Sequence, residues 1–374
     1  MAFLTTRNSY ISNFKNLMFI VKIFKKLLFI TPIIVMIFGF DYYVDPANIF
    51  KGADFYRDIV TILLKGKNVA GISNLDDRLL QKELIGRLTH KKDIVVLGSS
   101  QIMQINSVMF PGYSFINNGV NRASVEDDMA IYWMYRKKGL FPSKILIGLN
   151  PYLLNKYNEL NRYKSLLIEY NEIATYLNVR NNNQNNADVV SDKYYELLSL
   201  GYFQTSFWYW VNQEKPFYLT VKAEEIQGVR HADGSLSYCY SWRNRSPAKV
   251  YSDALVAVSQ DPSNVYSNFG KFDSLDPDLI YKFDKLICLM QRDNVEVTFI
   301  LTPYHPKVYQ QLVENINYRI IKDAEKFFIE YAKNHNIRMI GSYNPSHFHF
   351  TNSDFLDDQH LRQEALYKIY YLYK

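Results

Sequence analysis

The chain has 374 residues, enough for one elaborated domain or two, and its two cysteines are too few for a disulfide framework. The formal net charge is +6, but five of the positive charges lie before residue 27, where no acidic residue occurs, so the remaining chain is close to neutral. This distribution argues against a nucleic-acid partner, because such a partner requires a dense field of Lys and Arg on the folded part.

The N-terminal segment predicts a membrane anchor. Residues 27–40 form the uncharged apolar run LLFITPIIVMIFGF, and the preceding LMFIVKIF lengthens it because Lys22 can snorkel to the lipid headgroups. We expect a cytoplasmic tail at 1–19 and one transmembrane helix at 20–43, with its cationic flank inside. The alternatives are a cleaved signal peptide, for which no small-residue cleavage site follows the apolar run, and a buried helix. The anchor predicts that the short tail lies inside and the rest of the chain lies outside the membrane.

After a linker and helical lead-in at 44–90, short apolar strands alternate with amphipathic helices in two parts of the chain, 91–150 and 273–374. A capping box formed by Ser124 and Asp127 marks one helix start, and Asp276 followed by Pro277 marks another. The predicted strands are 94–97, 113–116, 145–149, 295–301 and 337–340, and the predicted helices are 76–88, 125–138, 277–292, 306–334 and 362–373. This alternation predicts an α/β fold, a three-layer doubly wound parallel sheet covered on both faces.

The alternation stops between 151 and 272, which we interpret as a mixed insertion that caps the carboxyl edge of the sheet. Asp233-Gly234 lies between two strand-like flanks and predicts a hairpin. The insertion also holds Trp208, Trp210 and Trp242, whose default interpretation is core packing, with a sugar-binding groove as the alternative.

Polar residues follow two of the predicted strands and precede the last helix. Ser99 and Ser100 follow the first strand, and Asn150 follows the third strand, where its amide can donate to an oxyanion. Near the end of the chain, Asp357 precedes His360 by three residues, so a carboxylate can accept from one imidazole nitrogen while the other faces a nucleophile. Each feature alone also has a plain interpretation as a turn or a helix cap.

Together, and in this order, these motifs resemble the SGNH (GDSL-like) hydrolase superfamily, and more narrowly its bacterial membrane-anchored members that modify surface glycans. Gly98-Ser99-Ser100 is similar to the first block, with Ser100 in the nucleophile place. Gly148-x-Asn150 is similar to the third block, and Asp357-x-x-His360 to the fifth. In the second block the usual Gly place is taken by Arg122, with Gly119 three residues earlier. The resemblance implies a flavodoxin-like SGNH sheet.

The resemblance also implies a mechanism of acyl transfer. His360 would take the proton of Ser100, Asp357 would orient the imidazole, and an oxyanion hole would form from the N–H of Ser100, the amide of Asn150 and the N–H of Arg122. The implied substrates are acyl esters on a cell-surface polysaccharide, handled by a transferase or an esterase. A multipass acyl-transfer protein is the implied membrane partner. The alternative is a catalytically silent scaffold that binds glycan or an export complex, and Arg122 is the feature that favours it.

Several further side chains have two interpretations each. His305 follows the fourth strand and is either a substrate contact or the cap of the next helix, and Ser99 is a second candidate for substrate binding. His347 and His349, with Asp354 nearby, lack a metal-ligand spacing, as do the two cysteines. We therefore expect no metal site and no cofactor.

Overall fold

The computed structural model forms two units, Met1–Ala53 with Gln184–Glu214, and Asp54–Asn183 with Lys215–Lys374. It describes residues 28–46, 52–72, 75–158, 161–180, 197–212, 228–259, 271–316 and 320–372, together with residues 26, 50, 194, 217, 218 and 318. Part of the predicted insertion therefore groups with the N-terminal segment, and the rest belongs to the larger unit.

The smaller unit contains a helix at residues 28–44 and helix α7 (Leu200–Asn212). The ring of Phe40 meets Phe203 and Trp210 edge-on, at centroid distances of 5.7 and 6.0 Å. The hydroxyl of Tyr202 donates to Asp45 Oδ1 at 2.9 Å. Trp210 thus packs against the N-terminal helix. Within the described ranges, no helix combines the length and the hydropathy that crossing a membrane requires. The predicted tail and the first residues of the predicted anchor, through 25, lie outside them.

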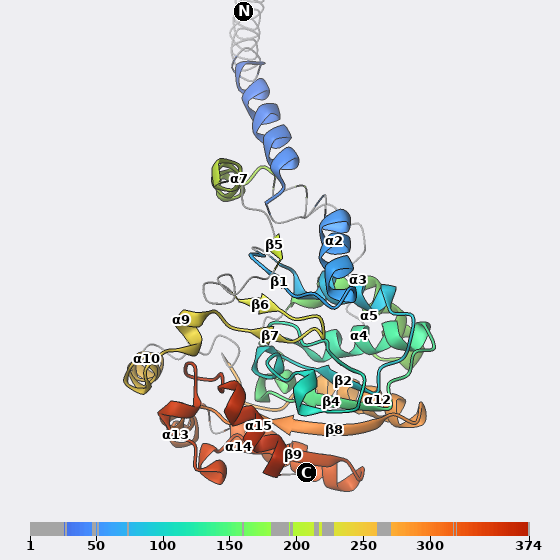
Figure 1. Cartoon of the computed structure of the whole chain (residues 1–374), viewed down its shortest axis with the longest axis vertical. Coiled ribbons are helices and arrows are strands. Elements are labelled where there is room, and N and C mark those ends of the chain that lie inside the picture. The colour runs from blue at the N-terminus through green and yellow to red at the C-terminus, as the bar shows by residue number, and fades with distance from the viewer. Residues whose placement is uncertain are drawn as a thin grey trace, which may run out of the picture. The chain divides into compact units, whose positions relative to one another are not determined.

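A five-stranded parallel sheet forms the centre of the larger unit (Figure 1). Its strands are β2 (Ile94–Leu97), β3 (Phe115–Asn117), β4 (Lys144–Gly148), β8 (Glu296–Leu301) and β9 (Arg338–Gly341). The spatial order is β3-β2-β4-β8-β9, which is 2-1-3-4-5 by order along the chain and matches the flavodoxin-like doubly wound arrangement. The predicted α/β class and the parallel sheet are confirmed. In such sheets ligands bind where the order reverses, here between the carboxyl ends of β2 and β4.

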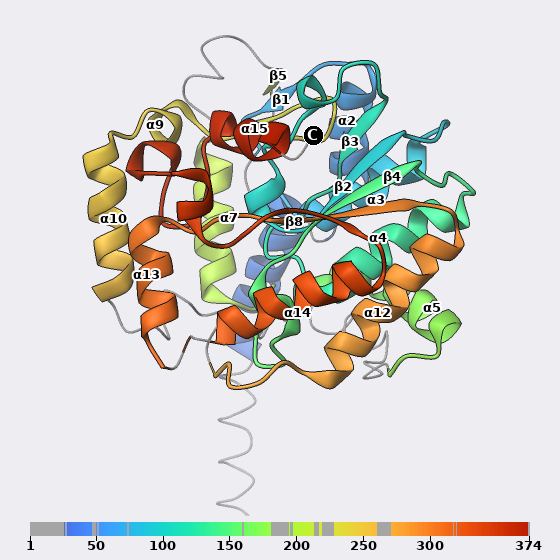
Figure 2. The same cartoon turned by 90° about the horizontal axis from the view of Figure 1, so that it is seen from below.

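Helices pack against both faces of this sheet (Figure 2). One face carries α4 (Val125–Lys137), α12 (Pro277–Arg292) and α14 (Ile320–Asn334), and the other carries α15 (Gln363–Leu372). The short 3-10 turns η1 (Ser100–Ile102) and η2 (Ser107–Met109) bury Ile102 and Met109 in the same cluster as α15. On the first face Phe283 of α12 packs against Phe299 of β8 at 5.6 Å. On the second face Val96 and Ile300 share a buried cluster with Leu366. Both faces bury apolar side chains, as the unbroken apolar strands predict.

A small antiparallel sheet lies beside β3 and contains the predicted hairpin. Its order is β5 (Phe217–Tyr218), β1 (Val69–Ala70), β6 (Val229–Arg230) and β7 (Leu236–Ser237). Asp233-Gly234 joins β6 to β7, and Gly234 takes a φ of +80°, which favours glycine. The carbonyl of Asp233 accepts the N–H of Asn117 at 2.8 Å, so the hairpin is attached directly to the edge of the parallel sheet.

The remaining helices of the larger unit are α2 (Gly52–Leu64), α3 (Asp77–Arg87), α5 (Leu167–Leu177), α9 (Tyr240–Arg243), α10 (Pro247–Ser259) and α13 (Pro306–Glu314). Of these, α3 matches the helix predicted at 76–88, whereas α2, α5, α9 and α10 were not predicted. The helix predicted over 306–334 is wrong as one element, because α13 ends at Glu314 and Asn315 is extended before α14 begins. The second strand is displaced from 113–116 to Phe115–Asn117, and Tyr113 is exposed.

Candidate active site

The carboxyl end of β2 turns sharply into η1. Gly98 has a φ of +125°, and a Cβ at this position would come within 2.7 Å of the Gly148 carbonyl oxygen on β4. Only glycine therefore fits where the two strand ends approach. Ser99 follows in extended conformation, and Ser100 is the first residue of η1. The turn places Ser100 beside the point where the strand order reverses.

The structure brings Ser100 and His360 together although they are 260 positions apart in the chain. The Ser100 Oγ lies 2.9 Å from His360 Nε2. On the other side of the ring, Nδ1 lies 2.8 and 3.0 Å from the two carboxylate oxygens of Asp357. Asp357 Oδ1 also accepts the backbone N–H of His360 at 2.7 Å, which fixes the carboxylate relative to the ring. A hydroxyl, an imidazole and a carboxylate thus form one continuous hydrogen-bonded chain.

The loop that carries His360 is held at both of its ends. The backbone N–H of Leu356 donates to the His360 carbonyl at 2.7 Å, and a short bridge joins Phe355 to Leu361. From the serine side, the Gln104 amide donates to the Leu361 carbonyl at 2.7 Å. These bonds tie the segment after η1 to the histidine loop and so stabilise the short distance between the two reactive groups.

Burial and the ion pair act in opposite directions on the two titrating groups. Burial alone would lower the pKa of His360, but the charge and the hydrogen bond of Asp357 outweigh it, so the pKa of His360 is raised. Burial would raise the pKa of Asp357, yet the imidazolium charge and several hydrogen bonds hold it below its usual value. The site therefore favours a proton on the imidazole and a charge on the carboxylate, which suits a general base that must accept a proton.

Asn150 follows β4 and lies 3% exposed, next to the serine turn. Its Nδ2 donates to the hydroxyl of Tyr152 at 3.2 Å, and that hydroxyl donates to Ser99 Oγ at 2.7 Å. Ser99 is thus buried and bonded within the protein, and of the two neighbouring serines it is Ser100 that faces the histidine. Among the described residues the N–H of Ser100 donates to no acceptor. These amides are the candidate oxyanion donors.

Arg122 takes the left-handed conformation, with a φ of +52°. This is the backbone geometry that glycine adopts readily. Gly119 is not an equivalent donor, because its N–H already donates to Asn117 Oδ1 at 2.8 Å. The guanidinium of Arg122 also acts electrostatically on Tyr152, which places its charge near the buried Tyr152–Ser99 pair.

A buried ion pair holds this left-handed turn in place. Arg78 donates from Nε and from a terminal nitrogen to the two carboxylate oxygens of Asp127, both at 2.7 Å. The same guanidinium donates to the carbonyl oxygens of Asn121 and Arg122, each at 3.2 Å. Asp127 also completes the capping box with Ser124, as predicted. Its role is therefore structural, and Arg78 is a positioning residue that no sequence motif indicated.

Aromatic side chains from the insertion border the histidine. Tyr238 meets the ring of His360 at a centroid distance of 5.6 Å, and Trp242 lies 6.5 Å from it. The two aromatic rings stack on each other at 5.3 Å, and the guanidinium of Arg245 lies 4.4 Å from the Trp242 ring. Trp242 was a candidate from the sequence, whereas Tyr238 was missed because nothing local indicates that the hairpin reaches the site.

His305 serves as a helix cap. Its Nδ1 accepts the N–H of Lys307 at 3.3 Å, its ring packs edge-on against Phe355, and its side chain is fully buried. Burial lowers the pKa of His305, with Asn352 and Asp357 acting in the opposite direction. Because a fully buried side chain cannot touch a substrate, the structure favours the capping interpretation over the substrate contact. Ser99, the other candidate for substrate binding, is likewise buried.

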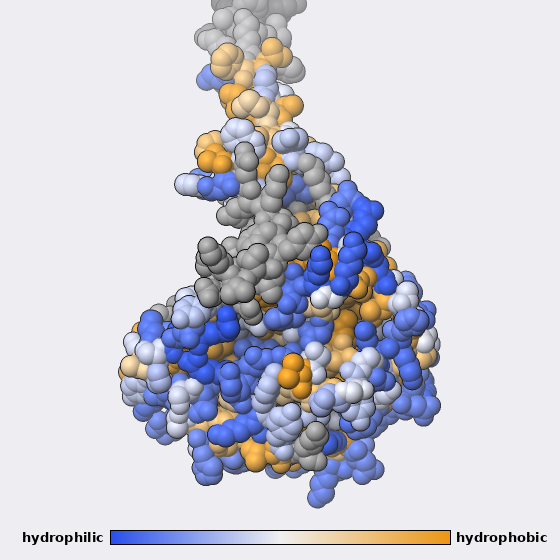
Figure 3. Space-filling view, viewed as in Figure 1, coloured by the Kyte–Doolittle hydropathy of each residue, from blue (hydrophilic) through white to orange (hydrophobic). Residues whose placement is uncertain are grey.

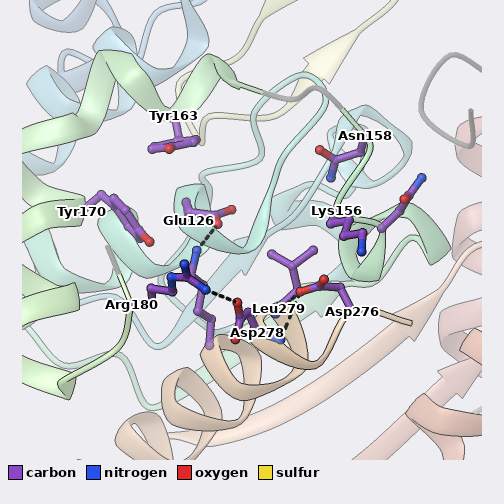
Figure 4. Close-up of a pocket in the computed structure, with 11 residues that line it drawn as sticks. Glu126, Lys156, Asn158, Tyr163, Tyr170, Arg180, Asp276, Asp278 and Leu279 are labelled. Atoms are coloured by element: carbon purple, nitrogen blue, oxygen red, sulfur yellow. Dashed lines mark hydrogen bonds and ion pairs between the residues drawn. The ribbon is translucent and has the colours of Figure 1, made fainter. Parts of the chain in front are cut away.

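Polar cavities elsewhere in the larger unit include one of about 320 Å³ between the starts of α4 and α12 (Figure 4). In it Lys282 pairs with Glu126 at 2.7 Å, and Arg180 points toward Asp278 at 3.5 Å. A cavity of about 390 Å³ lies beside the hairpin and includes His231. Neither cavity is lined by Ser100, Asp357 or His360.

Comparisons of the chain with protein-family models, with curated proteins and with solved structures find no match. The assignment of the site therefore depends on the geometry of this chain.

Proposed function

We propose that the chain is an SGNH-type serine esterase or O-acyltransferase that acts on acyl groups of a cell-surface polysaccharide. One observation carries the proposal: Ser100 Oγ lies 2.9 Å from His360 Nε2, while Nδ1 of the same ring is bonded to Asp357. Nucleophile, base and orienting carboxylate are the three parts that activate a serine. Their positions at a switch point of a doubly wound sheet support a ligand site there.

In the proposed reaction the Ser100 oxygen attacks the ester carbonyl carbon, and its proton moves to His360 Nε2. The carbonyl electrons become the negative charge of an oxyanion, which the N–H of Ser100, the amide of Asn150 and the N–H of Arg122 stabilise. The imidazolium then returns its proton to the leaving alcohol as the C–O bond breaks, and an acyl-serine remains. Asp357 stays ionised and keeps the ring in the tautomer that has Nε2 free to accept.

A second alcohol or water completes the cycle on the acyl-serine. Water makes the chain an esterase, and a sugar hydroxyl makes it a transferase. The stacked pair of Tyr238 and Trp242 beside His360 supports a sugar acceptor, since the faces of aromatic rings suit the apolar faces of sugars.

The N-terminal helix supports attachment to a membrane as part of the same proposal. Large apolar side chains between residues 28 and 36 are exposed, among them Leu28 at 73% and Phe29 at 81%. Apolar residues are visible at the surface of the described part of this helix (Figure 3). Exposed apolar surface of this kind indicates contact with lipid or with another protein. With the cationic flank before it, this helix would anchor the domain on the periplasmic side of a bacterial inner membrane, next to a multipass partner that supplies acyl groups.

A fluorophosphonate probe tests the catalytic part of the proposal. The probe should label the protein on one serine, and Ser100→Ala should abolish labelling. Ser99→Ala is the matched control, because this neighbouring hydroxyl is bonded to Tyr152 and should be dispensable for labelling. If the folded wild-type protein reacts neither with the probe nor with an activated ester, the chain is a silent scaffold and the enzymatic proposal is wrong.

The choice between esterase and transferase needs a separate measurement. The acyl-enzyme formed from an activated ester is mixed with an oligosaccharide, and the products are analysed by mass spectrometry. Acylated sugar indicates a transferase, and free acid alone indicates an esterase. Trp242→Ala should lower sugar acylation more than hydrolysis if the aromatic pair holds the acceptor.

A further inference from the structure

A second group of reactive side chains lies on α12 and at the end of α14. Asp284 and Cys288 are four residues apart on α12 and therefore share one helix face. His335 directly follows the last residue of α14. One candidate ligand atom from each of the three lies within 4.8 Å of the other two. Cys288 is exposed and the other two are half-buried, so a solute ion can reach them.

We propose that these three side chains bind a divalent transition-metal ion of the zinc type. Tetrahedral zinc has bonds of about 2.0 to 2.3 Å, which place neighbouring ligand atoms about 3.3 to 3.7 Å apart. Asp284 Oδ1 lies 3.7 Å from Cys288 Sγ and 3.8 Å from His335 Nε2. Asp284 therefore lies close to tetrahedral spacing from each of the other two ligands, and the ligand atoms of Cys288 and His335 lie within 4.8 Å of each other.

The donor set selects the class of metal. A thiolate with an imidazole favours zinc and its neighbours over magnesium or calcium, which prefer oxygen ligands alone. Three protein ligands leave the fourth position for water. On binding, the Cys288 thiol releases its proton to solvent and a sulfur–metal bond forms, with no change in the oxidation state of either partner.

A single tyrosine orients two of the three ligands. His335 Nδ1 lies 2.9 Å from the Tyr331 carbonyl oxygen, so Nδ1 carries the hydrogen and the lone pair of Nε2 is turned toward Asp284. The Tyr331 hydroxyl donates to Asp284 Oδ1 at 2.9 Å. Its ring stacks on the imidazole at 3.9 Å and packs edge-on against Phe283 of the core. Metal-binding histidines and carboxylates usually have such supporting hydrogen bonds.

The backbone at His335 is also fixed relative to α12. The Gln291 amide donates to the His335 carbonyl at 3.1 Å, three residues after Cys288 along the same helix. The two elements that carry the ligands are therefore joined by side-chain hydrogen bonds on both sides of the cluster. A preorganised cluster binds an ion with little rearrangement.

Cobalt substitution tests this site on the full chain. After treatment with a chelator under reducing conditions, addition of Co²⁺ should give the strong visible bands of tetrahedral cobalt and a thiolate-to-cobalt charge-transfer band, at one ion per chain. Zinc should displace the cobalt and remove both. Cys288→Ser should abolish the charge-transfer band, whereas Cys239→Ser, the matched control at the other cysteine, should retain it.

The supporting tyrosine gives a quantitative test. Tyr331→Phe should weaken zinc binding by about 10 to 100-fold, measured by competition with a chromophoric chelator. If this variant fails to fold, His335→Gln at the partly exposed ligand replaces it and should weaken binding at least as much. Cobalt bands that are only octahedral, or zinc affinity unchanged in Cys288→Ser and His335→Gln, would overturn the proposal. These outcomes are independent of fluorophosphonate labelling at Ser100.

Discussion

The ends of strands β2 and β8 lie at the same edge of the sheet, and both carry side chains capable of chemistry. At the end of β2, Ser100 is partly exposed and faces the imidazole of His360. At the end of β8, Thr302 and His305 are 3% and 0% exposed. The Thr302 hydroxyl donates to Gln101 at 2.5 Å, and His305 caps α13. A position at the carboxyl edge of the sheet is therefore not enough to make a side chain reactive. Its exposure and its hydrogen-bond partners decide whether it can act on a substrate.

The two histidines show the same contrast in their protonation. Both are buried, and burial disfavours the charged imidazole in each. Asp357 accepts a hydrogen bond from His360 and reverses the effect there, whereas at His305 the effect of burial prevails. Only the histidine with a carboxylate partner is suited to store a proton during a reaction.

The largest expected difference between these regions is in rate. His360→Ala should slow fluorophosphonate labelling by on the order of 10⁴ to 10⁶. His305→Ala should leave the labelling rate of folded protein nearly unchanged but lower the free energy of unfolding by about 2 kcal/mol, because a helix cap and buried contacts are lost. Labelling time courses and urea unfolding measure the two effects. If both variants are folded and lose labelling equally, His305 also acts in the reaction, and the proposed difference between the two histidines is wrong.

The next prediction compares two buried polar side chains, Asn150 after β4 and Thr302 after β8. Asn150→Ala should lower kcat for an activated ester by about 10² to 10³, or about 3 to 4 kcal/mol, with little change in KM, because an oxyanion donor acts mainly in the transition state. Thr302→Val is the matched change after β8. It leaves the buried Gln101 oxygen unpaired, so it should lower the free energy of unfolding by about 1 to 3 kcal/mol and leave kcat within about tenfold. If Thr302→Val lowers kcat strongly and Asn150→Ala does not, the catalytic role proposed for Asn150 is wrong.

Local signals predicted much of the fold. The capping box at Ser124, the Asp276-Pro277 helix start and the Asp233-Gly234 hairpin were found because each is encoded within a few residues. The break between α13 and α14 was missed because apolar periodicity continues across it. Strand β1 was missed because two residues carry no periodic pattern.

The candidate site was predictable only as separate pieces. The sequence placed Ser100, Asn150 and the Asp357–His360 pair near the sheet edge, but the distance between Ser100 and His360 depends on contacts made over the whole fold. The Arg78–Asp127 pair spans 49 positions and the Tyr331–Asp284 bond spans 47. Pairs of this kind are set by tertiary packing, which no local motif encodes.

The pH dependence of the reaction should also separate the two histidines. Because the pKa of His360 is raised above 6.5, kcat/KM should rise with pH and reach half its maximum above pH 6.5. In Asp357→Asn the larger of the two carboxylate charges that raise this pKa is absent while burial and Asp358 remain, so the midpoint should move to lower pH while the maximal rate falls by about 10⁴. The raised pKa also stabilises the fold below pH 6.5, and this contribution is lost as the pH rises through the pKa of folded His360.

Asp358 provides the control for that profile. Burial, followed by the charge of Asp357, raises the pKa of Asp358 to about 6, so it titrates close to the histidine. Asp358→Asn should retain a midpoint above pH 6.5 if His360 controls the rate. If the midpoint disappears in Asp358→Asn but persists in Asp357→Asn, the pH dependence comes from Asp358, and its assignment to His360 is wrong.

The smallest expected effect distinguishes the backbone N–H of Arg122 from its guanidinium charge as the group that acts at the site. Arg122→Gly removes the strain of a left-handed arginine, about 1 to 2 kcal/mol, but makes the unfolded chain more flexible by about 0.5 to 1 kcal/mol. The free energy of unfolding should therefore rise by about 0.5 kcal/mol, and kcat should stay within a few-fold if only the backbone N–H is used. Arg122→Ala keeps the N–H and the strain while removing the guanidinium. A large fall in kcat in both variants would show that the cation itself acts at the β2 end.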